Sequence, residues 1–407
     1  MTSTWTFMVY MAGDNNLSSA GEEDLREMRR VGSTDDVNLV VQFDNAGRHG
    51  TERYRVLRDG DDVVESLGET DSGDPNVLLD FIGWARARYP ADRYALVLWN
   101  HGGGWEPSAM DEIAQQVRSH GYRAHEGVER AASPLGRVFF RPSLQTILGL
   151  STPQERAICS DDGTGHSLDT VELGKVLEKA VEVLGAPLEL LGMDACLMSS
   201  LEVACQVRPY VRYMVASEES EPNEGWPYDT VLPALVENPG LSTPDLAAHI
   251  VSAYVRSYSD RAYAGDVTQA ALDLSRLDGI STALGHLADA LSARLPRART
   301  QIWSAQKQAK RFWQNTLADV GSFAAEVKRA TQDAPTRAAA DEVMEALQPG
   351  PGRFVVAEAH QGPGVSACSG VTVYLPSPLV GVSRFYAELD ASRQLTWCPM
   401  VEAYVRA

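Results

Sequence analysis

The most constraining feature of this sequence is a series of short apolar runs, rich in β-branched residues, that alternate with helical patterns in its first half. Such alternation is typical of a mostly parallel β-sheet covered by helices. The sequence therefore predicts an α/β fold in which a mostly parallel sheet is sandwiched by helices. The strand candidates are Thr6 to Met11, Asn38 to Phe43, Tyr94 to Trp99, Glu189 to Met193 and Arg212 to Ala216.

The sequence pattern changes in the rest of the chain. Between residues 106 and 160 the periodic patterns weaken, which in a compact protein indicates a long functional loop. After residue 236 the pattern is helical, and strand character returns at residues 354–357 and 371–375, so this region is predicted to rejoin the sheet. Residues 1–105 and 161–235 are predicted to form the two halves of the sheet core. Residues 106–160 are the linker between them, and residues 236–407 are the helical C-terminal region.

Charge and hydropathy exclude some partners. The 407 residues include 36 Lys and Arg against 55 Asp and Glu, and the formal charge of −19 would repel nucleic acid and anionic membranes. No apolar run reaches the roughly 18 residues of a membrane span. We therefore expect neither nucleic acid nor a membrane as a partner. The first residues lack the basic start of a signal peptide, which predicts a cytoplasmic protein.

One segment with chemical potential is YALVLWNHGGGW, residues Tyr94 to Trp105. A strand runs directly into His101, and ligands in open α/β sheets bind beyond the carboxyl ends of strands. The glycines that follow let the backbone approach a substrate and turn its N–H groups inward, as an oxyanion hole requires. Gly102 is the candidate donor. The competing interpretation is a histidine in an ordinary glycine turn.

A second segment is LELLGMDACLMSSLEVA, residues Leu188 to Ala204. It predicts a strand, then Cys196, then an amphipathic helix that carries Leu197 and Leu201 on one face. A cysteine near a helix N-terminus is favoured as the thiolate, and a histidine adjacent in space would act as its base. The competing interpretation is a small core hydrophobe.

Other kinds of site fit less well. The five cysteines form no CxxC pair and the remaining histidines are scattered, so neither a disulfide framework nor a zinc site is predicted. An esterase also uses HGGG as an oxyanion hole but needs a GxSxG turn, and the nearest match, Gly364 to Cys368, lacks the last glycine.

With these two segments in view, the chain resembles the clostripain-like cysteine peptidases, a family with a caspase-like fold. The motifs that match recur in order over most of the chain: FMVYMAGDNNL, TDSGDPNVLLDFIGWA, LVLWNHGGGW, GMDACLMSSLEVA, SEESEPNEGWPYD and GVTVYLP. The resemblance implies a cysteine endopeptidase with a caspase-like core in which His101 is the general base and Cys196 the nucleophile. The oxyanion would be held by the backbone N–H groups of Gly102 and Cys196.

The resemblance also implies a substrate preference. Family members that cleave after Arg or Lys place an acid before the cysteine at the floor of the S1 subsite, which here is Asp194. A second acid before the Gly-Trp pair corresponds to Glu224, where Asp was expected. Peptides with a basic P1 residue are therefore the expected substrates, with Arg against Lys left open. The alternative role for Asp194 is to cap the helix that follows.

Finally, the resemblance implies a precursor that is cut between its two halves, by itself or by an upstream protease. The candidate cleavage sites are the arginines Arg118, Arg123, Arg130, Arg137, Arg141 and Arg156. The alternative is that they only solvate a loop. The chemistry requires no cofactor, and some relatives depend on calcium, but no calcium ligand is predicted because residues 160–172 do not match EF-hand spacing. A different class of function would be a non-catalytic caspase-like scaffold that binds basic peptide segments.

Overall fold

A computed structural model describes most of the chain. The described residues are 2–14, 17–46, 50–58, 60, 63–100, 102, 104–105, 168–261, 263–295 and 298–406, without the side chains of residues 313 and 314. His101 and all six candidate cleavage sites lie outside this set.

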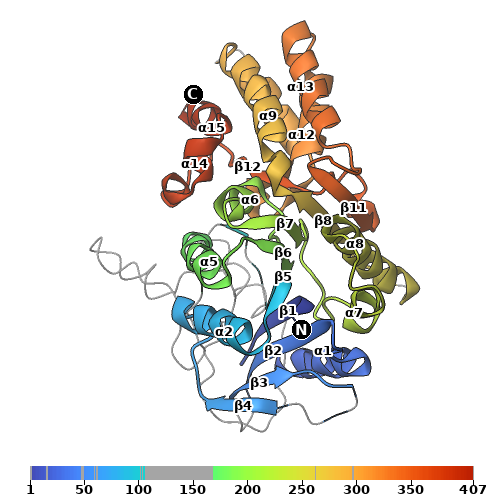
Figure 1. The fold of residues 1–407 in the computed structure, drawn as a ribbon. Coiled ribbons are helices and arrows are strands. Elements are labelled where there is room, and N and C mark those ends of the chain that lie inside the picture. Colours follow the sequence, from blue (N-terminus) through green and yellow to red (C-terminus); the bar gives the residue numbers. More distant parts are fainter. Residues whose placement is uncertain are drawn as a thin grey trace, which may run out of the picture.

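Nine strands of the described residues form one sheet in the order β11-β8-β7-β6-β5-β1-β2-β3-β4 (Figure 1). Their bounds are β1 Ser3–Gly13, β2 Val37–Asn45, β3 Thr51–Arg55, β4 Val63–Gly68, β5 Ala91–Trp99, β6 Leu188–Asp194, β7 Val211–Ala216, β8 Val267–Asp273 and β11 Val355–Gln361. The five central strands run parallel. The strands at both margins join antiparallel. All five predicted core strands are confirmed, and the fold is the predicted α/β sandwich.

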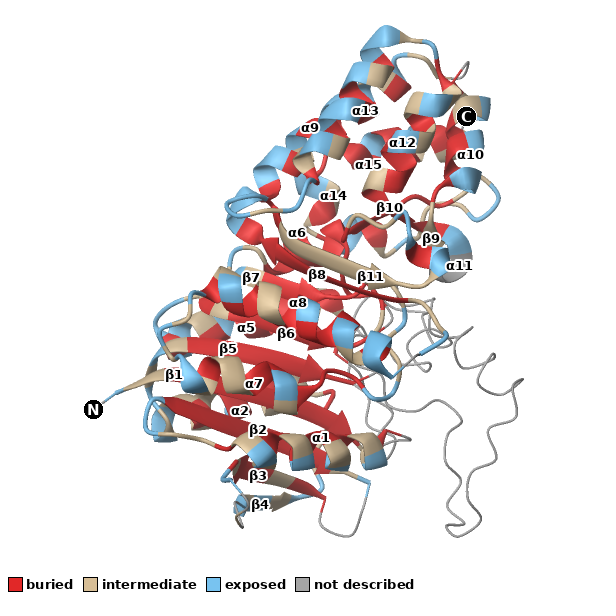
Figure 2. Cartoon of the chain, turned by 90° about the vertical axis from the view of Figure 1, so that its right-hand side faces the viewer, coloured by how far each residue is buried: buried red, intermediate tan, exposed pale blue. Residues whose placement is uncertain are grey.

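Helices cover both faces of this sheet because each central strand is apolar on both sides. In β1, Met8 and Tyr10 point into one core, while Phe7 and Val9 point into the other. The first core is closed by α2 (Pro75–Arg88), α5 (Thr170–Leu184) and α6 (Leu201–Val207). The second is closed by α1 (Ser18–Val31), α7 (Tyr228–Glu237) and α8 (Thr243–Asp260). Figure 2 shows the buried strands between these two helical layers.

The C-terminal region stacks helices beyond the β8 side of the sheet (Figure 2). Its helices are α9 Leu277–Ser292, α10 Arg299–Gln308, α11 Trp313–Thr316, α12 Val320–Ala330, α13 Ala334–Ala346, α14 Ala391–Gln394 and α15 Trp397–Arg406, with 3-10 turns η1 Leu274–Arg276, η2 Pro363–Val365 and η3 Tyr386–Glu388. A small antiparallel sheet joins β9 Arg311–Phe312, β10 Leu317–Asp319 and β12 Thr372–Tyr374.

The chain returns to the main sheet through β11, as predicted for residues 354–357. The other late strand prediction, 371–375, corresponds to β12, which pairs with β10 in the small sheet instead. β11 already occupies the edge beside β8, so no place in the main sheet is left there. Among the described residues, no helix is both long and apolar enough to span a membrane.

The site is positioned by two neighbouring parallel strands. Trp99, at the end of β5, lies opposite Asp194, at the end of β6. The Asn100 backbone N–H continues this pairing by donating to the Asp194 carbonyl at 3.3 Å. Carboxyl ends of parallel strands meet at one edge of a sheet, so the segments that follow β5 and β6 emerge side by side.

Candidate active site

Cys196 lies two residues after the end of β6 and is half-buried. The Glu221 backbone N–H donates to its Sγ at 3.2 Å, and the thiol faces the Glu221 carbonyl at 3.7 Å. Gly102 lies so close that a Cβ there would overlap the Cys196 carbonyl oxygen. Burial raises the pKa of the Cys196 thiol, and hydrogen bonds from the backbones of Glu221 and Gly102 act in the opposite direction.

The structure corrects the expected helix after the cysteine. α6 begins only at Leu201, with Ser200 as its N-cap, so its N-terminus does not reach Cys196. The intervening residues bond to another loop: Leu197 N–H donates to the Glu219 carbonyl at 3.2 Å, and Ser199 N–H to the Ser217 carbonyl at 2.9 Å. This pairing holds Leu197 at a φ of 65°, outside helical backbone. The dipole of α6 therefore does not act on the Cys196 thiol in this structure.

Gly102 is brought to Cys196, but His101 itself lies outside the described residues. Its neighbour Asn100 is buried and donates from Nδ2 to the Ala12 carbonyl at 2.5 Å. That bond ties the end of β5 to the end of β1. The base role of His101 stays a prediction that rests on the order of the strands and on the sequence motif.

Asp194 is buried at the end of β6, with 4% of its surface exposed. Its Oδ2 accepts hydrogen bonds from the Trp226 backbone N–H at 3.2 Å and the Tyr228 hydroxyl at 2.9 Å. Burial raises the pKa of this carboxyl to about 6, against hydrogen bonds that lower it, chiefly from Glu221. Asp194 does not cap α6, because Ser200 does.

The carboxyl beside Asp194 belongs to Glu221, whereas Glu224 is exposed. The Glu221 side chain hydrogen bonds to that of Asp194, and its Oε1 accepts from Gln269 Nε2 at 3.2 Å. Burial, the Asp194 charge and the bond to Asp194 raise the pKa of Glu221 well above its ordinary value. We call Asp194 and Glu221 the acid pair. Glu221 was not predicted as a site residue, although it is one of the acids in the motif SEESEPNEGWPYD.

Aromatic residues of α7 and α8 enclose the acid pair. Tyr258 donates from its hydroxyl to the Gly225 carbonyl at 3.0 Å. Gly225 itself has a φ of 52°, and a Cβ there would lie 2.8 Å from Asp194 Oδ1, so only glycine permits this approach. The Tyr254 hydroxyl is buried and has no hydrogen-bond partner in the described part of the chain. These helices lie outside the cysteine and histidine motifs, so no local signal indicated them.

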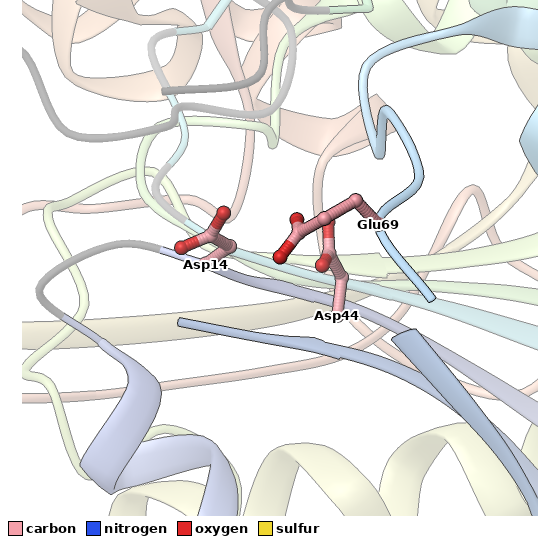
Figure 3. A group of neighbouring side chains, drawn as sticks. All are labelled: Asp14, Asp44 and Glu69. Carbon is pink, nitrogen blue, oxygen red and sulfur yellow. The ribbon is translucent and has the colours of Figure 1, made fainter. Parts of the chain in front are cut away.

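One acidic group in the described residues has a geometry that suits a metal ion. Asp14, Asp44 and Glu69 bring carboxylate oxygens within 4.8 Å of one another at the ends of β1 and β2 (Figure 3). Oxygen donors of this kind suit calcium. Acidic groups with this spacing are also common without an ion. Calcium dependence therefore stays a prediction, and residues 160–167, where acids cluster in the sequence, lie outside the described residues.

The fold and the strand-end thiol define a class, the α/β cysteine hydrolases with a caspase-like sheet. Within that class, the chain belongs to the clostripain family, whose model matches residues 9–134 and 145–404. That family is one of cysteine-type endopeptidases. Clostripain of Hathewaya histolytica is 26% identical over 273 residues. That match covers 59% of this chain and 44% of clostripain, so the chain matches less than half of that protein's length.

Solved structures share the fold over nearly the whole chain. A secreted C11 cysteine protease from Bacteroides thetaiotaomicron, bound to an irreversible peptide inhibitor, has a TM-score of 0.66 and 19% identity, covering 98% of this chain and 99% of its own. An inactive zymogen C11 protease from Parabacteroides distasonis has a TM-score of 0.66 and 17% identity, covering 97% and 99%.

The predicted cytoplasmic location is wrong by the same comparison. The first of these structures is described as secreted, and so is a further one from Bacteroides thetaiotaomicron with a TM-score of 0.64, 15% identity and coverage of 98% of this chain and 99% of its own. The prediction rested on the first residues alone, and nothing else in the sequence supported it.

Proposed function

We propose that this chain is a cysteine endopeptidase that cleaves after a basic residue, with Cys196 as nucleophile and His101 as general base. Asp194 carries the proposal. It is a buried carboxyl directly beneath the cysteine segment, and it forms no ion pair with a lysine or arginine in the described part of the chain. A buried acid without a cationic partner suits a substrate that brings one.

The reaction follows the general chemistry of cysteine peptidases. His101 takes the Cys196 proton, and the thiolate attacks the backbone carbonyl carbon of the basic residue. The backbone N–H groups of Gly102 and Cys196 stabilise the oxyanion, and His101 returns the proton to the leaving amine. Water then hydrolyses the thioester. No step needs a cofactor.

We also propose that the chain is made as a precursor activated by cleavage at one of the linker arginines. Family membership supports this, since one solved relative is described as an inactive zymogen. In addition, burial raises the pKa of the Cys196 thiol, which favours the protonated and less nucleophilic form before activation. Alanine substitution of the linker arginines, singly and together, should remove the activating cut. Unchanged processing and activity in the combined variant would contradict the precursor proposal.

The test of the main proposal is hydrolysis of fluorogenic peptides with Arg, Lys, Asp or Leu at P1, before and after limited proteolysis, with calcium or chelator. We expect activity on Arg or Lys that disappears in Cys196→Ala. In Asp194→Asn, kcat/KM on basic P1 should fall at least about 100-fold, because losing a paired charge costs several kcal/mol. Loss of activity with chelator would establish calcium dependence.

Two outcomes would count against this proposal. Equal cleavage after Leu and Arg would remove the S1 role of Asp194. No hydrolysis under any condition, combined with retained binding of basic peptides, would favour the scaffold alternative, in which the acid pair binds such segments without cutting them.

A further inference from the structure

The acid pair has a feature that the proposed function does not use. Two carboxylates cannot hydrogen bond to each other unless one carries a proton, yet the side chains of Asp194 and Glu221 are bonded. Both carboxyl groups are shielded from solvent. This desolvation is the main reason that a second negative charge on the pair is unfavourable. Both observations fit a single proton that is held between the two carboxyl groups.

Unsatisfied acceptors surround this pair. Gln269 Oε1 and the Tyr254 hydroxyl are buried and have no hydrogen-bond partner among the described residues. Gln269 contacts the pair directly, since its Nε2 donates to Glu221, and Tyr254 is close enough to be influenced by Glu221, Asp194 and Cys196. Buried acceptors without donors are rare, and two beside one acidic pair favour a ligand that brings N–H groups.

We propose that Glu221 is a specificity-determining residue whose carboxyl shares one proton with Asp194 in the resting enzyme, and that a basic P1 side chain displaces this proton as it binds. The inference rests on the proposed function. The balance is simple: the pair goes from one negative charge to two, the ligand supplies one positive charge, and the proton leaves to the solvent. No bond in the substrate changes in this step.

Other titratable groups face the pair from each packed element. They are Asp24 on α1, Tyr228 on α7, Tyr254 and Tyr258 on α8, and Cys196. Farther out, Glu219 acts on Cys196, and Glu224 and Arg261, the C-cap residue of α8, act on Tyr258. The carboxyl of Asp24 repels a negative charge on Asp194 and so favours a proton on the pair, whereas the Tyr228 hydroxyl donates to Asp194 and acts in the opposite direction. Arg261 is the one cation in this set, and its guanidinium lies 5.8 Å from the centre of the Tyr258 ring.

The experiment measures proton release on binding. Cys196→Ala protein, cut in the linker if activation requires it, is titrated calorimetrically with a peptide that ends in P1 Arg, in buffers of different ionisation enthalpy. We expect close to one proton released per peptide bound in mildly acidic buffer. The Kd should fall by about tenfold per pH unit until the pair loses its proton unaided, and then level off.

Glu221→Gln in the same background should abolish this linkage. Its amide donates permanently to Asp194, so no proton is left to displace, and the pH slope of Kd should flatten. Glu221→Asp, which keeps the titrating group, should retain proton release. Glu237→Gln is the matched control, because it removes the same charge from an exposed site at the end of α7.

In the active enzyme the same linkage should appear in KM and not in kcat, which a purely structural role of Glu221 would not produce. Peptide binding and cleavage after Arg without proton release would overturn this inference and leave the proposed function intact. Equal proton release in Glu221→Gln would also overturn it. If P1 Arg and P1 Leu peptides bind and react alike, the proposed function itself fails.

Discussion

At the scale of single residues, Gly102 and Gly225 show why this site tolerates no side chain at two positions. Each backbone approaches a functional group: Gly102 the Cys196 backbone, and Gly225 the Asp194 carboxyl. The run of three glycines around Gly102 was visible in the sequence, and its chemical meaning was predicted. The constraint on Gly225 arises only because its loop folds over β6.

We therefore expect Gly102→Ala to lower kcat/KM at least about 100-fold, the usual cost of losing an oxyanion-hole donor. The added Cβ would overlap the Cys196 carbonyl, so the end of the β5 segment must move. Steady-state kinetics on a P1 Arg substrate measure the effect. Gly83→Ala is the control, because an added Cβ in α2 meets nothing within 4 Å. It should leave activity unchanged and increase the free energy of unfolding by up to about 1 kcal/mol. A fully active Gly102→Ala enzyme would exclude Gly102 from the oxyanion hole.

At the scale of elements, the local sequence pattern predicted the core strands more accurately than the short helix α6. The five core strands are apolar on both faces and needed no distant partner to be recognised. Helix α6 was predicted to follow Cys196 at once, because Leu197 and Leu201 have helical spacing. Bonds from Leu197 and Ser199 to the 217–219 loop are the reason that the helix starts later.

Because α6 starts only after the cysteine segment, a substitution at its N-cap should change the stability of the protein and leave the chemistry of Cys196 unchanged. The Ser200 hydroxyl accepts from the Val203 N–H at 3.2 Å, so Ser200→Ala should destabilise the protein by about 1 kcal/mol. Because α6 does not reach Cys196, the pH profile of kcat/KM should keep its shape. Urea unfolding and a pH–rate profile measure the two effects, and Ser242→Ala at the start of the distant helix α8 is the control for the cap. If the acid limb of the pH–rate profile shifts in Ser200→Ala and not in Ser242→Ala, the N-terminus of α6 does influence the Cys196 thiol.

At the scale of the whole molecule, a second buried acid pair joins the sheet core to the C-terminal region. Glu218 lies two residues after the end of β7, and Asp319 ends β10 and caps α12. Their side chains hydrogen bond to each other, and Glu218 Oε2 also accepts from the Gly370 N–H at 3.0 Å. Burial and the neighbouring charge of Asp319 raise the pKa of Glu218 well above its ordinary value of 4.5. Lys310 and Glu219 add an ion pair nearby, with 3.1 Å between Nζ and Oε2.

A raised carboxyl pKa determines the direction of the pH effect. The folded protein binds more protons than the unfolded chain, so this contribution to stability is complete below pH 4.5 and is lost as pH rises toward the folded pKa. Glu218→Gln supplies a permanent donor to Asp319. We expect its melting temperature to exceed that of the wild type by several degrees at pH 8 and to match it near pH 5.

Scanning calorimetry at the two pH values decides this prediction, with Glu237→Gln as the control for a simple change of net charge. An equal shift of the melting temperature at both pH values would mean that the substitution acts through packing and that no proton is held by Glu218 and Asp319.

The sequence by itself determined the sheet, its parallel core and the two strand-end motifs, because apolar periodicity and glycine runs are local properties and parallel strands place their ends at one edge. It also indicated Asp194, which lies within the cysteine motif. Only the tertiary structure decided which acid joins Asp194, since Glu221 and Glu224 occupy the same loop and differ in whether the fold buries them. Contacts with Gln269 and Tyr254 likewise depend on β8 and α8 packing over that loop, and no pattern near Cys196 encodes them.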